Sequence, residues 1–171
     1  MSTLERRYGR ATMSETTQAA PERAEGGVTG DWLARAAVTE APDAIVVTDP
    51  DGIVRVWNNG AARVFGFSAA EIVGQSLDMI IPEKLRDRHW RGYRETMLTG
   101  YTRYGDKLLS VPATHRDGRR LSVEFSVALL RDDADQIVGI SAIMREVSER
   151  REAEKALRTK LTELESRVGS A

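Results

Sequence analysis

Residues 81–100 read IPEKLRDRHWRGYRETMLTG, and the interpretation of the whole chain depends on this stretch. Pro82 suits the first turn of a helix, where the missing N–H costs little. Gly100 suits the end of a helix, where a residue in the left-handed conformation helps to satisfy the last carbonyl groups. The stretch therefore predicts a single helix between Pro82 and Gly100.

The predicted helix has one apolar face that carries a histidine. Leu85, Tyr93 and Met97 recur at near-helical spacing and predict an apolar stripe. His89 lies four residues after Leu85 and four before Tyr93, so it falls on the same stripe. A histidine turned towards an apolar interior either fills space or holds a ligand, and both interpretations remain open at this stage.

The segments on both sides of this helix predict a small α+β domain. Alternating apolar residues from Arg120 to Leu130 are typical of a half-buried strand, and Asp-Gly pairs at 51–52 and 117–118 are typical of hairpin turns. We expect strands at 44–48, 53–57, 102–114, 120–130 and 136–144, and further helices at 32–40, 60–65, 69–73 and 76–80. Asp31 is the expected N-cap of the first helix. This order predicts a five-stranded antiparallel sheet with its helices on one face.

The two ends of the chain differ in pattern from this core. Residues 1–29 are polar and carry too few apolar residues for a face, so we expect a disordered arm. From Val147 onwards the sequence predicts a charged helix whose apolar residues fit one heptad register, namely Leu157, Leu161, Leu164 and Val168. A short dimeric coiled coil and a single frayed helix are both open alternatives, because three heptads form only a marginal coil.

Composition limits the classes of function. The 171 residues carry 25 basic and 26 acidic side chains, a formal net charge of −1, which predicts no direct binding of nucleic acid. No cysteine is present, which excludes thiolate metal sites and cysteine nucleophiles. No signal peptide, membrane span or enzyme motif is recognisable. We therefore expect a cytoplasmic protein that is not an enzyme and does not bind membranes.

Several short motifs together resemble the PAS family, also called S-box or PAS/PAC sensory domains. They are the hairpin and asparagine at 49–58, the small helices of 61–74, the long helix between Pro82 and Gly100, the turn at 116–118, and the element Glu146-Val147-Ser148-Glu149-Arg150. The last resembles the Asp-X-Thr-X-Arg element that ends such domains, with Glu for Asp and Ser for Thr. The resemblance implies a PAS domain over residues 30–148, preceded by the arm 1–29 and followed by a signalling helix over 149–171.

The resemblance also implies what the chain does. PAS domains sense small molecules, light or redox state between the sheet and the helices, or act as dimerisation modules. We expect a stand-alone sensory protein that binds a small ligand and signals through a dimeric C-terminal helix. The implied partners are a second copy and a signalling protein such as a histidine kinase or a regulator of transcription. A ligand-free dimerisation adaptor is the alternative that needs no ligand at all.

Haem b is the cofactor that the resemblance raises, although the sequence leaves the cofactor unknown. In haem-binding oxygen-sensor PAS domains the proximal histidine follows a proline of the long helix by seven residues, as His89 follows Pro82. His89 is therefore the candidate axial ligand, and a metal ligand only if haem iron is bound. The other candidate cofactor-binding residues are Leu85, Tyr93, Leu108 and Leu109.

Overall fold

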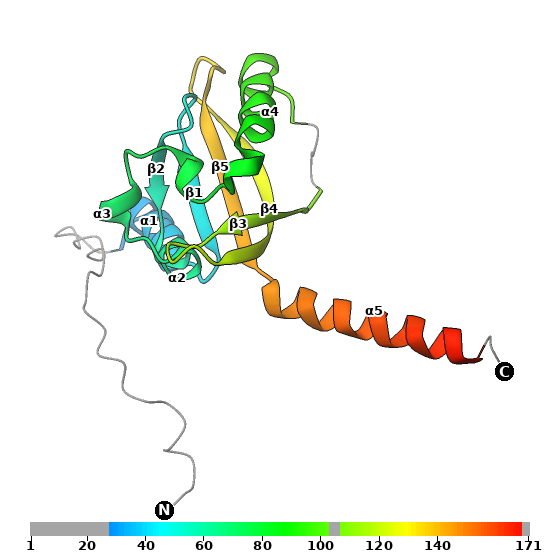
Figure 1. Ribbon diagram of the computed structural model, residues 1–171. Helices are drawn as coiled ribbons and strands as arrows, with labels where there is room; N and C mark the ends of the chain where they lie inside the picture. The colour runs from blue at the N-terminus through cyan, green and yellow to red at the C-terminus, as the bar shows by residue number, and fades with distance from the viewer. Residues whose placement is uncertain (1–27, 103–106, 169–171) are drawn as a thin grey trace, which may run out of the picture.

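A five-stranded antiparallel sheet forms the centre of the protein (Figure 1). The computed structural model describes residues 28–102 and 107–168. The strands lie in the order β2-β1-β5-β4-β3 across the sheet. Their bounds are β1 Ala44–Thr48, β2 Val54–Trp57, β3 Leu109–Thr114, β4 Arg120–Arg131 and β5 Ile137–Glu146. The first and last strands of the chain thus pair in the middle of the sheet, which brings the C-terminal end close to the first hairpin.

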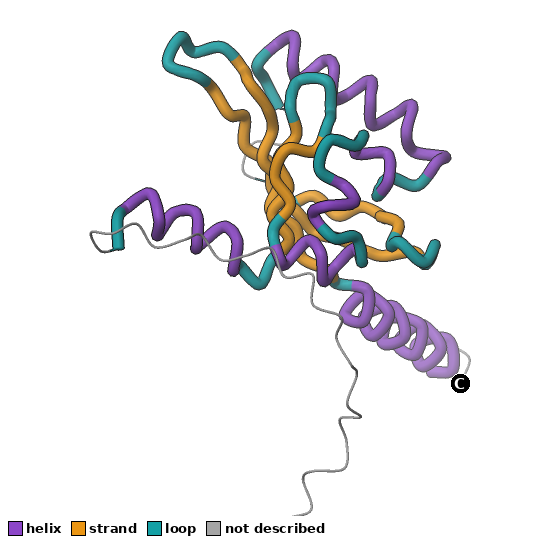
Figure 2. Tube along the Cα trace, turned by 90° about the vertical axis from the view of Figure 1, so that its left-hand side faces the viewer, coloured by secondary structure: helices purple, strands orange, loops and turns teal. Residues whose placement is uncertain are grey.

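The helices α2, α3 and α4 connect the hairpin of β1 and β2 with the hairpin of β3 and β4, while α1 precedes β1 and α5 follows β5. Their bounds are α1 Gly30–Glu40, α2 Asn59–Phe65, α3 Ala69–Ile72, α4 Arg86–Thr99 and α5 Ser148–Val168, with short 3-10 turns at Leu77–Met79 and Glu83–Leu85. In Figure 2 the helices α2, α3 and α4 lie on one side of the sheet, and α1 projects from the other. The expected fold class, an α+β domain with terminal helices, is confirmed.

The hydrophobic core lies between the sheet and the two small helices α2 and α3. Its strand residues include Val46, Trp57, Leu121 and Val123. Its helix residues Ala61, Phe65 and Ile72 are fully buried. The same face of the sheet is less well covered further along β4, where Phe125, Val127 and Leu129 are only half-buried. Their registered neighbours on β5 are Met144, Ala142 and Ile140.

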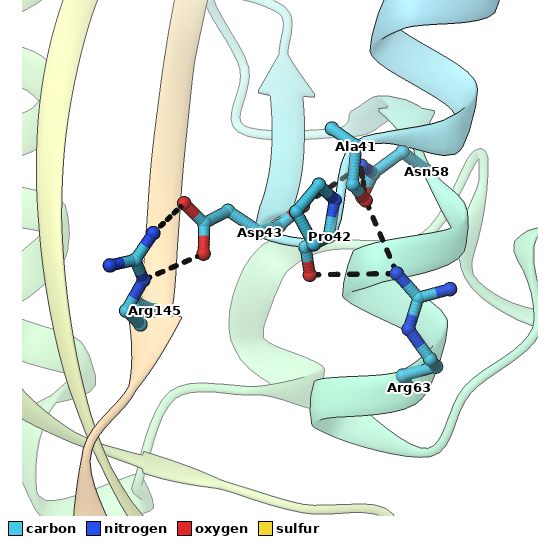
Figure 3. Close-up of polar contacts among 6 residues, drawn as sticks. All are labelled: Ala41, Pro42, Asp43, Asn58, Arg63 and Arg145. Atoms are coloured by element: carbon cyan, nitrogen blue, oxygen red, sulfur yellow. Dashed lines mark hydrogen bonds and ion pairs between the residues drawn. The ribbon is translucent and has the colours of Figure 1, made fainter.

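A buried asparagine joins α1, β1 and α2 (Figure 3). The Asn58 side-chain oxygen accepts hydrogen bonds from the backbone N–H groups of Ile45 and Ala61, each at 2.8 Å. Its amide nitrogen donates to the carbonyl oxygens of Val38 at 3.0 Å and Asp43 at 2.9 Å, with Ala41 at 3.4 Å. Asn58 therefore caps α2 and fixes the segment before β1 with one side chain.

Two arginines, one in an ion pair and one in hydrogen bonds to carbonyl groups, hold the same segment from outside. Arg145 on β5 pairs with the Asp43 carboxylate through two N···O contacts of 2.8 and 2.7 Å, a bidentate geometry. This hydrogen bond is the main reason why the pKa of Asp43 lies below its usual value. Arg63 on α2 donates to the carbonyl oxygens of Ala41 and Pro42 at 3.2 and 3.5 Å.

Three local expectations need correction. Thr29, and not Asp31, caps α1: its hydroxyl accepts a hydrogen bond from the Trp32 N–H at 3.1 Å. The long helix does not begin at Pro82, because a 3-10 turn intervenes and α4 starts at Arg86. The strand expected at 102–114 is β3 from Leu109 onwards, and residues 103–106 lie outside the described residues. The disordered arm expected at 1–29 also lies outside them, apart from Val28 and Thr29.

Candidate ligand site

The inward face of α4 carries a cluster of three rings, His89, Trp90 and Tyr93. The ring centroids of His89 and Trp90 are 4.8 Å apart, those of His89 and Tyr93 are 5.8 Å apart, and those of Trp90 and Tyr93 are 5.4 Å apart. Positions i, i+1 and i+4 of a helix bring such side chains together on one side. The structure thus brings two of the candidate residues, His89 and Tyr93, into contact.

Tyr93 connects α4 to the end of β1. Its hydroxyl donates to the carbonyl oxygen of Asp49 at 2.5 Å and lies 2.9 Å from the hydroxyl of Thr48. Because the single phenolic hydrogen is used by Asp49, the Thr48 hydroxyl must donate to Tyr93. Tyr93 is 7% exposed, and burial raises the pKa of its phenol. The phenol is therefore a structural hydrogen-bonding group.

Trp90 fixes α4 against the turn between β1 and β2. Its indole N–H donates to a carboxylate oxygen of Asp78 at 2.7 Å. A Cβ atom on Gly52 would lie 2.2 Å from two ring carbons of Trp90, and Gly52 has φ +78°. Only glycine leaves the ring this space and adopts this backbone conformation without strain. Arg86 adds a hydrogen bond of 3.0 Å to the Asp78 carbonyl oxygen.

His89 differs from its neighbours because one of its nitrogens has no partner. Within residues 28–102 and 107–168, its Nδ1 is the one buried side-chain nitrogen or oxygen that makes no hydrogen bond. Burial lowers the pKa of the imidazole and outweighs the opposite effect of the Asp78 carboxylate. His89 is therefore neutral at neutral pH, with one ring nitrogen available to a hydrogen-bonding ligand.

The other candidate residues lie in different surroundings. Leu85 ends the 3-10 turn before α4 and is half-buried, and Leu109 begins β3 and is also half-buried. Leu108, just before β3, is 63% exposed and does not form an enclosed wall. The sequence did not indicate Thr48, Asp78 or Gly52 as neighbours of α4, because their contacts with it span 12 to 45 positions of the chain.

The chain leaves the domain through a connection to β4. The N–H of Val147 donates to the Ser122 carbonyl oxygen at 2.8 Å, and the Ser122 N–H donates to the Ser148 hydroxyl at 2.9 Å. Glu146 accepts a hydrogen bond from the Ser148 N–H at 2.8 Å. Arg150 on α5 pairs with Glu124 on β4 at 2.5 Å. Glu146 and Ser148 thus form hydrogen bonds at the two positions where they replace the Asp and Thr of the family element.

The described part of the chain contains neither a cluster of metal-ligating side chains nor a membrane-spanning helix. Residues 28–102 and 107–168 contain no group of three or more His, Cys, Asp or Glu side chains that could hold a metal ion. No helix within the same ranges is long and apolar enough to cross a membrane.

Comparison with solved structures identifies PAS and light-sensing domains. A PAS domain from Colwellia psychrerythraea is 23% identical, with a TM-score of 0.60 over 68% of this chain and 96% of that one. An RNA-binding light-oxygen-voltage receptor is 20% identical, with a TM-score of 0.63 over 84% of this chain and 41% of that one. A sensory box histidine kinase/response regulator from Burkholderia thailandensis is 16% identical, with a TM-score of 0.55 over 77% of this chain and 97% of that one. These likenesses show the fold.

The family is shown by the sequence itself. No curated protein matches the chain. The family model described as "PAS domain" matches residues 42–149, from the segment before β1 to the start of α5. This match covers more than half of the chain and includes all five strands together with α2, α3 and α4. The chain therefore belongs to the PAS domain family.

Proposed function

We propose that this PAS domain is a sensory module that binds a small organic ligand on the helix side of its sheet. In this proposal the bound state passes through a dimeric α5 to a signalling partner. The observation that carries the ligand is the unpartnered, buried Nδ1 of His89. A buried polar atom without a hydrogen bond costs about 1–3 kcal/mol, and a ligand that supplies the partner recovers this cost.

The sheet offers an apolar surface on the same side. Phe125, Val127 and Leu129 lie on the face of β4 that carries the core residues Leu121 and Val123, but they are only half-buried. A small molecule with an apolar body and one hydrogen-bonding group fits such a surface together with a neutral imidazole. This chemistry supports an organic ligand without naming it.

A contact on β4 supports the transmission. Glu124 lies between Val123 and Phe125, and successive residues of a strand point to opposite faces. The Glu124 carboxylate holds Arg150 of α5 from the outer face. A ligand that displaces Phe125 therefore moves Glu124 as well, and with it the first turn of α5. The exposed leucines Leu157, Leu161 and Leu164 form the surface that pairs with a second copy, so a movement of α5 changes this pairing.

Haem at His89 is the alternative that the site supports less well. A histidine that ligates a metal almost always donates its other ring N–H to an acceptor, which fixes the tautomer. Nδ1 of His89 has no such acceptor among the described residues, and the rings of Trp90 and Tyr93 flank the imidazole. The described residues therefore do not form a complete haem site.

One experiment on the purified protein decides between the alternatives. The protein is expressed with haem supply, its absorption spectrum is recorded, and small molecules released by denaturation are identified by mass spectrometry. The wild type, His89→Ala and His115→Ala are compared, because His115 is the only other histidine. We expect an organic molecule from the wild type and from His115→Ala, and its loss from His89→Ala.

Two results would contradict the proposal. A strong Soret band that is lost only in His89→Ala would make the protein a haem sensor. Absence of any released molecule, together with no ligand-dependent rise in melting temperature in a screen of small organic compounds, would leave an interaction module without a ligand.

A further inference from the structure

The outward face of α4 carries cations that have no partner. Elsewhere in the described residues, seven arginines form ion pairs with carboxylates: Arg55, Arg86, Arg116, Arg119, Arg131, Arg145 and Arg150. Arg88, Arg91 and Arg94 on α4 and Lys84 just before it are all exposed. None of these four has an ion pair or a side-chain hydrogen bond within the described ranges. Arg35, Arg120 and Arg158 likewise have no ion pair among the described residues, but Arg88, Arg91 and Arg94 are the three that lie together on one helix.

These cations share one face of the helix with an exposed leucine. Arg88, Arg91 and Arg94 follow one another at intervals of three residues, and Leu98 lies four residues after Arg94 and two turns after Arg91. Leu98 is 87% exposed, the most exposed large apolar side chain among the described residues. The face therefore combines positive charge with an apolar contact point at its C-terminal end.

A recess borders the same face. It lies where α4 meets the turn between β1 and β2, has a volume of about 370 Å³, and is lined by Pro50, Asp51, Ser76, Trp90, Tyr93 and Arg94. Arg94 belongs both to the recess and to the row of cations. The ring of Trp90 gives the recess an aromatic wall, and the contact with Gly52 and the hydrogen bond to Asp78 hold this ring in place. The recess can accept one apolar side chain next to the open guanidinium of Arg94.

The charge pattern selects a protein partner. Asp87 and Glu95 lie on the same face as Arg91, at intervals of four residues. A nucleic acid would place its uniform row of phosphates against these two carboxylates, and the net charge of −1 supplies no wider attraction. An anionic lipid surface would meet the same two carboxylates. A protein segment can place acidic residues opposite the arginines and other residues opposite the carboxylates.

We infer that the outward face of α4, defined by Arg88, Arg91, Arg94 and Leu98 together with the adjoining recess, docks an acidic segment of a partner protein. The segment carries carboxylates for the three arginines, an apolar residue for Leu98 and a second apolar side chain for the recess. In Figure 1 α4 and α5 lie at opposite ends of the molecule, so this surface is separate from the C-terminal helix. The inference does not depend on the proposed ligand or on dimerisation through α5.

The test measures binding of a defined peptide to the full chain. A fluorescent synthetic peptide with Glu and Leu at helical spacing is titrated and followed by anisotropy, beside the same peptide with Lys in place of Glu and beside labelled oligouridylate. We expect the Glu peptide to bind, and the double variant Arg88→Glu/Arg91→Glu to weaken this binding by about tenfold or more, because the reversed charges repel the carboxylates of the peptide. Leu98→Ala is expected to weaken it by about threefold or more.

A matched control separates this face from general charge. Arg35→Glu/Arg120→Glu makes the same change of net charge at two other exposed arginines, and we expect it to leave peptide binding within about twofold of the wild type. Circular dichroism and melting temperature confirm that each variant is folded.

Three outcomes would overturn the inference. They are equal loss of peptide binding in the two double variants, absence of binding by the Glu peptide, and tighter binding of oligouridylate that Arg88→Glu/Arg91→Glu abolishes. The last outcome would assign the face to nucleic acid.

Discussion

Asn58 shows how much of this fold depends on one side chain. Its amide joins the end of α1, the start of β1 and the first turn of α2, and it is 2% exposed. The neighbouring Gly60 belongs to the same junction, because a Cβ atom there would lie 2.1 Å from the carbonyl oxygen of Asp43. The junction therefore combines a fully used amide with a close backbone contact.

We expect Asn58→Asp to destabilise the protein by about 2–4 kcal/mol, because a carboxylate cannot donate to the carbonyls of Val38 and Asp43 and leaves them unpaired. Urea unfolding at pH 7 followed by circular dichroism measures the change. Asn59→Asp is the control, since Asn59 makes one exposed contact with Glu40, and it should cost less than about 1 kcal/mol. Equal losses in the two variants would show that the amide donors of Asn58 contribute little.

His89 predicts a dependence of stability on pH that carboxylates do not share. Burial lowers its pKa in the native state, so the unfolded chain binds the extra proton first. The free energy of unfolding should therefore fall as the pH drops below the unfolded value of about 6.5, with a slope of at most about 1.4 kcal/mol per pH unit. Asp43 and Asp49 have lowered pKa values, so their contributions decrease only below about pH 4.

The measurement is the free energy of unfolding of wild type and His89→Phe in urea between pH 5 and pH 7. Phenylalanine keeps the ring and removes the titration. We expect the slope in this window to become flatter in the variant. Identical slopes would show that His89 is not the group whose protonation destabilises the fold.

At the scale of the element, two glycines at the junction of α4 with the β1–β2 turn have different roles: Gly92 lies in α4, and Gly52 lies in the turn. Gly92 is exposed in the middle of α4, and a Cβ atom there would meet nothing within 4 Å. Gly52 has φ +78° and lies against the ring of Trp90. One glycine is thus unfavourable for its helix, and the other is required by its turn.

We expect Gly92→Ala to stabilise the protein by about 0.5–1 kcal/mol, because alanine has the higher helix propensity. Gly52→Ala should destabilise it by about 2 kcal/mol or more, because it combines a strained backbone with displacement of Trp90. Thermal melting of both variants gives the two signs directly. A lower melting temperature for Gly92→Ala would mean that α4 needs flexibility at that position.

The elements also show what the sequence predicts and what it does not. Strand β4 follows from local alternation, the turns of the β1–β2 and β3–β4 hairpins follow from their Asp-Gly pairs, and the left-handed Gly100 ends α4 as expected (φ +66°). The predicted N-cap of α1 was wrong because Thr and Asp are both favourable N-cap residues, and the choice between Thr29 and Asp31 depends on where the chain turns. The pairing of Tyr93 with Thr48 could not be predicted, because it depends on how α4 lies over the sheet. The exposure of Leu108 depends on the same packing.

At the scale of the whole molecule, α5 is the part of the structure with the least internal support. Its first turn is bound to β4, while Leu157, Leu161 and Leu164 are 71%, 56% and 56% exposed. A helix of 21 residues is only marginally stable by itself, so α5 would gain most of its stability by burying these leucines against a partner. In a parallel pair, Lys160 and Glu165 of the two copies occupy the g and e positions that form ion pairs between helices.

We expect the full chain to be dimeric at micromolar concentration and Leu161→Glu to shift it to the monomer, because a charge at the centre of the seam cannot be buried in the coil. Thr159→Glu is the matched control, since Thr159 is an f position two residues before Leu161 and lies on the side of the helix opposite the seam. Sedimentation equilibrium measures the dissociation constant of all three proteins, and Leu161→Glu should raise it by about a hundredfold or more. If Leu161→Glu and Thr159→Glu behaved alike, α5 would not be the dimer interface, and the signal would have to leave the domain by another surface.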